Sequence, residues 1–346
     1  MEPSTLPGES ASAFNDAYQT ERASYITRAT ADSPDIGIRV VLHTFVYGSE
    51  TTDPSEVKNA YLAALKPLRE KFLFNEVRNE HVTRVHHWDR DAFTVLAFHT
   101  CSDSWTTGVK VVVLSPIFRN QSWKIYIPQL MEALRLIPSF EVSFNEHTPL
   151  YVQISLGDEP FPANDLKKIS KAVIIFEDRL SAHHPNAHNL QYQFCGRNKY
   201  FGEIDTTAEK IEEIERQSEY GSAERLALLM NPDRDDSGRG RTEGFAGPLE
   251  GIIRNRGRPG TKKENYGVYF HYNEHYYAIE FRQAAGTLDA EWTLDWIERV
   301  ILFTTQAIKT SDSCFLNWAK NRIENKDIYL SFGVQAPKGV TDFWWG

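Results

Sequence analysis

The sequence contains little sulfur and no long apolar run. Its 346 residues include three methionines and three cysteines, which are Cys101, Cys195 and Cys314. An odd cysteine count without a CxxC pair excludes a disulfide framework and a cysteine zinc site, and it favours a reducing compartment. No stretch of about 18 apolar residues is present, so we expect no membrane span. The N-terminus is acidic and polar, which predicts no signal peptide and therefore a cytoplasmic protein.

Positive charge is also scarce. Lys and Arg together number 38 against 47 for Asp and Glu, which gives a net charge of −9. This balance argues against a general nucleic-acid binder. One local exception is the run Arg-Gly-Arg-Pro at 256–259, followed by Lys262 and Lys263. The run is similar to an AT-hook, which binds the DNA minor groove. Because four residues are weak evidence, we favour a solvated basic loop and expect no nucleic-acid partner.

Aromatic residues are abundant. They make up 12% of the chain, with 20 Phe, 15 Tyr and 8 Trp. Such residues build large cores and line pockets for flat or apolar ligands. Apolar residues at 41% and charged residues at 25% are typical of soluble globular proteins.

The composition changes along the chain predict one domain with two additions. Residues 1–34 are rich in Ser, Thr, Ala, Glu and Pro, so we expect a flexible N-terminal segment. Residues 35–346 then form a single domain. Within it, residues at about 203–263 turn acidic and then rich in Gly and Arg, which predicts a charged insertion.

Hydrophobic periodicity predicts the elements of this domain. We expect strands at 36–42, 92–99, 108–114 and 150–156, and a hairpin of 266–272 with 276–282. We expect helices at 54–74, 126–136, 165–180 and 290–309. Strands and helices mixed without strict alternation indicate an α+β fold, with a largely antiparallel sheet and packed helices.

One segment carries a specific signature. Residues 278–289 read Ala-Ile-Glu-Phe-Arg-Gln-Ala-Ala-Gly-Thr-Leu-Asp, and Trp296 follows. This resembles the amidoligase family, in which a strand bearing Glu-Phe-Arg-Gln-His runs into Gly-Thr-Leu-Asp and a helix with Trp. The blocks at 36–41, 111–116, 148–154 and 165–180 resemble other family blocks in the same order. The resemblance covers roughly 36–310, and a fungal source is expected because the family is common in filamentous fungi.

The resemblance implies a fold like that of glutamine synthetase and related carboxylate–amine ligases. These enzymes form an amide at the expense of ATP. Activation of the carboxylate as an acyl phosphate requires magnesium to neutralise phosphate charge. Carboxylates at positions i and i+2 of a strand point to one face, where they can bind the ion.

The family's ligand positions are changed in this chain. They fall on Arg39, Val41, Val112, Tyr151, Gln153 and Ala284, and an additional acidic position falls near Phe98. Valine cannot bind a metal, and an arginine would repel one. In four blocks the apolar residues of the family pattern are present, while the metal-ligand positions hold other residues. We therefore expect no metal site. The cleft then suits an uncharged or aromatic ligand with a few hydrogen-bonding groups.

The remaining polar residues are the candidate site. We expect Glu280 and Arg282 to be catalytic, with Glu280 as acid or base and Arg282 as an anion clamp. The candidate substrate-binding residues are Tyr151, Gln153, Arg39, Gln283 and His188. The structural alternatives are a retained ion pair at 280 and 282, drift at 151 and 153, and a surface loop at 188.

Three functions follow from this pattern. The first is an enzyme of amidoligase-like fold that acts on a small molecule in biosynthetic metabolism, with no cofactor. The second is an ATP-dependent ligase, which would use ATP and Mg. The third is an inactive paralogue that binds a partner. We expect a small-molecule substrate, while a protein partner or a homo-oligomer remains an alternative.

Overall fold

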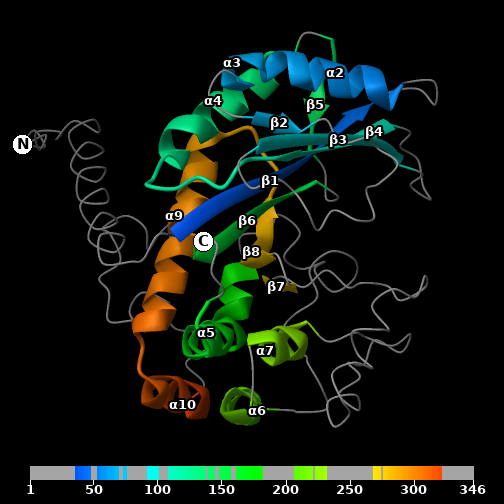
Figure 1. Cartoon of the computed structure of the whole chain (residues 1–346). Helices are drawn as coiled ribbons and strands as arrows, with labels where there is room; N and C mark the ends of the chain where they lie inside the picture. The colour runs from blue at the N-terminus through cyan, green and yellow to red at the C-terminus, as the bar shows by residue number, and fades with distance from the viewer. Residues whose placement is uncertain are drawn as a thin grey trace, which may run out of the picture.

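The computed structural model describes twelve stretches of the chain. These are residues 36–47, 53–69, 73–75, 92–100, 108–137, 139–144, 148–156, 161–181, 206–220, 223–231, 268–273 and 276–321. The predicted segment 1–34, the basic run 256–259 and His188 lie outside these stretches. Within them the fold is mixed, with a mostly antiparallel sheet and packed helices, which confirms this part of the expectation (Figure 1).

The described strands form one eight-stranded sheet. Its order is β2-β3-β4-β1-β6-β8-β7, and β5 pairs with β1 beside this path. Only the short contact between β2 and β3 is parallel among the described strands. The strands are β1 (Ile36–Tyr47), β2 (Leu73–Asn75), β3 (Ala92–Thr100), β4 (Gly108–Leu114), β5 (Val142–Ser143), β6 (Pro149–Leu156), β7 (Val268–Asn273) and β8 (Tyr276–Ala285).

Eight described helices accompany the sheet. They are α2 (Pro54–Ala64), α3 (Lys66–Arg69), α4 (Trp123–Arg135), α5 (Ala163–Ser181), α6 (Thr207–Tyr220), α7 (Ala223–Met230), α9 (Ala290–Lys309) and α10 (Asp312–Lys320). Figure 1 shows α9 running along the sheet from the level of α4 to that of α10. In the described part of the chain, every helix is too short or too polar to cross a bilayer.

The predicted helix 54–74 is wrong in its last third. Helix α2 ends at Ala64, a single turn follows, and residues 73–75 form a strand beside β3. Pro67 explains the break, because it has no backbone N–H for a helical hydrogen bond to Ala63 and its ring would clash with that carbonyl if α2 continued. Pairing with β3 then decides the conformation of the three residues, which helical spacing in the sequence could not reveal.

Period-two alternation gives the sheet two different faces. On β1, Val40, Leu42 and Val46 are fully buried and join the main core with residues of the helices. We call this the covered face. Helix α9 packs here through Trp296 and its neighbours, and the ring of Phe303 lies 6.0 Å from that of Phe281 on β8.

The first part of the predicted insertion belongs to the helical layer. In α6 and α7, Ile211, Ile214 and Leu226 are fully buried in the main core. The buried ammonium of Lys171 on α5 contacts Glu215 of α6 and lies 2.8 Å from a carboxylate oxygen of Asp312 on α10. Ion pairing and apolar packing therefore join α5, α6 and α10. Residues 232–263 lie outside the described stretches.

Candidate functional site

The opposite side of the sheet, which we call the open face, carries a separate side-chain cluster. Its apolar members come from strands only, and the main core's helices contribute none of them. They are Val41, Leu96, Val112, Leu114 and Tyr151. Arg39 and His43 alternate with Val41 along β1 and so share this face.

Strand register brings the candidate residues of three strands together on the open face. Arg39 of β1 pairs with Gln153 of β6, and Gln153 pairs with Glu280 of β8. Val41 pairs with Tyr151 in the same ladder. Residues far apart in the sequence are therefore adjacent, because directly opposed side chains lie about 5 Å apart.

Glu280 is the centre of a buried hydrogen-bonded group. Only 3% of Glu280 is exposed, and its carboxylate accepts from Arg282 Nε at 2.5 Å. The side-chain amide of Gln153 donates to the other carboxylate oxygen. Burial by itself would lower the pKa of Arg282, but the nearby Glu280 carboxylate and two tyrosines raise it above its ordinary value. The guanidinium of Arg282 is therefore charged at neutral pH.

Two tyrosines flank the guanidinium. The central carbon of Arg282 lies 5.0 Å from the ring centre of Tyr151 and 4.6 Å from that of Tyr269 on β7. Each contact is within the range of a cation–π interaction, worth about 0.5–2 kcal/mol. Arg282 is thus fixed by a carboxylate and by two aromatic rings.

Arg39 is held differently. Its Nε donates to the carbonyl oxygen of Ser115 at 2.8 Å, and the residue is 3% exposed. The Ser115 hydroxyl in turn accepts from the backbone N–H of Val40 at 2.9 Å. The turn after β4 therefore positions Arg39 at the edge of the candidate site.

Gln283 is placed on this face by a bulge. Between the pairs Val152–Phe281 and Leu150–Ala284, β8 has one residue more than β6, so Arg282 and Gln283 both oppose Tyr151. Neither amide atom of Gln283 has a hydrogen-bond partner within the described structure, although the residue is fully buried. A buried amide without a partner is costly, and a ligand that satisfies it would be stabilised.

Ala284 does not belong to the open face. It is part of the main core and pairs with Leu150, whose side chain also packs there. The bulge is the physical reason, because it reverses the alternation after Arg282. The backbone of Phe98 pairs with Lys110, but its side chain lies outside what the structure describes.

His43 is a site residue that the sequence reasoning missed. Its ring centre lies 4.7 Å from that of Tyr151, and both ring nitrogens are buried without a partner in the described stretches. Burial, reinforced by the positive charge of Lys110, lowers its pKa well below the usual value of 6.5, so the ring is neutral at pH 7. The signal was available, since His43 follows Arg39 and Val41 at the same spacing.

Within the described stretches, no three His, Cys, Asp or Glu side chains are grouped so that they could hold a metal ion. The single described cysteine, Cys314, is unpaired and lies on α10.

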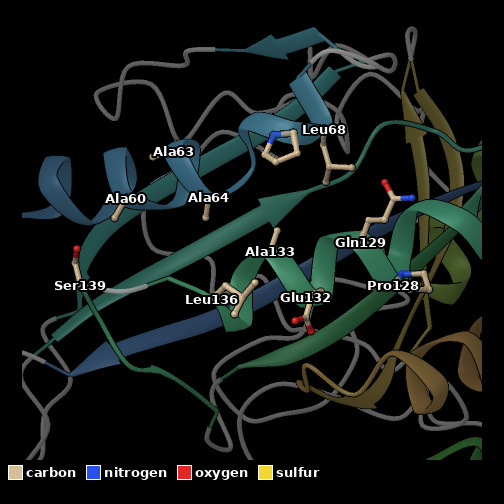
Figure 2. A pocket seen from close by; sticks show the side chains of 11 residues that line it. Ala60, Ala63, Ala64, Leu68, Pro128, Gln129, Glu132, Ala133, Leu136 and Ser139 are labelled. Carbon is tan, nitrogen blue, oxygen red and sulfur yellow. The ribbon is translucent and has the colours of Figure 1, made fainter.

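A groove lies elsewhere in the molecule, between α2–α3 and α4 (Figure 2). Its volume is about 740 Å³, and small or apolar side chains make up most of its wall. The lining residues are Ala60, Ala63, Ala64, Pro67, Leu68, Pro128, Gln129, Glu132, Ala133, Leu136 and Ser139. None of the predicted site residues lines it, so the groove and the open-face cluster are separate features.

Comparisons with known proteins give no family for the chain. A scan against models of protein families finds no match, and a search of curated proteins also finds none.

Proposed function

We propose that this chain is a cytoplasmic enzyme of amidoligase-like fold that acts on a small, flat and largely uncharged molecule without ATP or magnesium. One observation carries the proposal. The positions at which the resemblance implies metal ligands in β1, β4 and β6 meet on the open face, beside the buried pair of Glu280 and Arg282.

The side chains at these positions support a ligand of low charge. Val41 and Val112 offer no donor or acceptor, and Tyr151 offers an aromatic ring. Arg39 would oppose a divalent cation through like charge. An apolar wall with a few fixed polar groups is typical of small-molecule sites.

Each polar group then has a role in the proposed site. Glu280, oriented by Gln153 and Arg282, accepts a hydrogen bond or a proton from an N–H or O–H group of the substrate. The ring of Tyr151 packs against the flat part of the substrate. The amide of Gln283 supplies both a donor and an acceptor.

The test is metabolite profiling with the purified full chain. We expect incubation with a small-molecule extract of the source organism to consume one compound and form another without added ATP. The variant Glu280→Gln should slow this conversion at least about a hundredfold, because it removes the proton acceptor. The matched control Leu136→Ala changes an exposed groove residue and should leave the rate unchanged.

Two other outcomes would overturn the proposal. Conversion that requires ATP and Mg²⁺, with ATP binding seen by isothermal titration, would favour the ligase. Absence of any conversion, together with deletion of the gene leaving the metabolite profile intact, would favour an inactive partner protein. The triple variant Val112→Glu, Tyr151→His and Gln153→His tests whether restored ligands bring back magnesium binding.

A further inference from the structure

A second polar group of the open face lies on β1 and β4, away from Glu280. Lys110 pairs with Phe45 in the ladder where Val112 pairs with His43, so Lys110 and His43 are diagonal neighbours on one face. Diagonal positions are within reach of a long side chain. The two residues therefore form a local amine–imidazole pair.

The imidazole of His43 contacts the ring of Tyr151, but neither of its nitrogens has a hydrogen bond in the described part of the chain. Lys110 beside it is partly exposed. Buried polar groups are nearly always satisfied, so the imidazole nitrogens of His43 need an explanation. A bound ligand that brings an oxygen atom would satisfy both residues.

The surroundings of Lys110 favour the neutral form of its amine. The side chain is only partly exposed and lies beside the apolar residues Phe45 and Val112. Burial lowers the pKa of Lys110 to about 8. Lysines in apolar surroundings are the usual amines for attack on carbonyl compounds.

We propose that Lys110 forms an imine with an aldehyde or ketone group of the ligand, and that His43 carries protons for this step. The neutral Lys110 nitrogen attacks the carbonyl carbon, and one of its two protons passes through His43 to the carbonyl oxygen, which gives a neutral carbinolamine. His43 then accepts a proton from the nitrogen and delivers one to the hydroxyl, which leaves as water while the C=N bond forms. The balance is amine plus carbonyl to imine plus water. The inference deepens the proposed function, since it places a carbonyl group on the ligand of the same face.

The test is reductive trapping with 4-formylbenzamide, a flat and neutral aldehyde, and cyanoborohydride at pH 7. Peptide mapping by mass spectrometry gives the labelling rate of each lysine in one sample. The exposed Lys66 and Lys320 are internal controls. At pH 7 about one Lys110 in ten is deprotonated, against about one in 2500 for an ordinary lysine. We expect Lys110 to be labelled at least about tenfold faster than either control, even after reduced access is allowed for.

Two variants distinguish a chemical role of Lys110 and His43 from a structural one. Lys110→Arg should abolish the label at this position and leave the labelling of Lys66 unchanged. His43→Ala should slow labelling of Lys110 about tenfold, and added imidazole should restore it, which a merely structural role would not predict. If imidazole restores nothing, the role of His43 is wrong.

Labelling of Lys110 no faster than that of Lys66 and Lys320 would overturn the proposal. The experiment needs no natural substrate and no turnover. No conversion in the metabolite assay together with fast labelling of Lys110 would reject the proposed function and support the reactive amine. Conversion together with slow labelling would support the proposed function and reject the reactive amine.

Discussion

The two faces of the sheet are formed by the same strands but carry different kinds of side chain. On the covered face, buried hydroxyls find partners, as that of Thr44 does with Tyr61 at 2.8 Å. On the open face, charged and polar side chains are concentrated, and several lack partners within the described stretches. His43, Thr94 and Gln283 are examples.

The difference indicates that residues important for stability and residues important for function lie on different faces of the sheet. A covered face of apolar residues and helices stabilises the fold, and buried hydroxyls such as that of Thr44 are hydrogen-bonded there. Unsatisfied polar groups on the open face lower the stability of the fold. A protein retains such groups where a ligand or a reaction needs them. Variants that act differently on the two faces test this interpretation.

Breaking the ion pair of the open face should have the largest effect. Glu280→Leu leaves Arg282 buried without its carboxylate, and we expect a loss of about 3–5 kcal/mol in the free energy of unfolding. The covered side offers a matched control in Lys171→Met, whose partners Glu215 and Asp312 reach water. Its cost should be near 1 kcal/mol.

A combined variant distinguishes function from stability at this pair. Replacing the whole group with Glu280→Leu, Arg282→Met and Gln153→Leu should recover most of the lost stability, because apolar residues of similar size can replace a buried pair. Urea unfolding measures both variants. A combined variant as unstable as Glu280→Leu would mean that the pair is needed for the fold itself.

Two threonines provide an isosteric comparison of the faces. Thr44→Val removes the hydrogen-bond partner of the buried Tyr61 hydroxyl, so we expect a loss of about 1–3 kcal/mol. Thr94→Val removes a hydroxyl that has no partner among the described residues, so thermal unfolding should show no loss or a small gain. Equal losses at both positions would contradict the distinction between the faces.

The smallest expected effect is a pH dependence from His43. Its pKa is lowered in the folded state, so the unfolded state binds more protons below about pH 6.5. The stabilisation is complete above pH 6.5 and is lost as the pH falls, by about 1.4 kcal/mol per pH unit. His43→Leu should remove this contribution. The stability difference between the wild type and the variant, measured from pH 7.5 to 5.5, should therefore change with pH, and a constant difference would show that the pKa is not lowered.

The sequence predicted more of the elements than of the site. Runs of β-branched residues placed β4 at its observed bounds, and helical spacing did the same for α9. Helical spacing misplaced residues 73–75, because their pairing with β3 is a contact between distant parts of the chain. The site was found in part, since the i and i+2 spacing of Glu280 and Arg282 puts them on one face. Ala284 was expected at the site, but it lies in the main core, because alternation in the sequence does not reveal the bulge before it.

What the sequence determined by itself is therefore local. Alternation and capping set the strands and helices, as Asp289 does by accepting from the N–H of Trp292 at the start of α9. The tertiary structure alone decided that Gln153 bonds Glu280, that Arg282 lies between Tyr151 and Tyr269, and that the ring nitrogens of His43 have no hydrogen bond to the described residues. These contacts join strands separated by more than a hundred residues in most cases, and their register depends on the packing of the whole sheet against its helices.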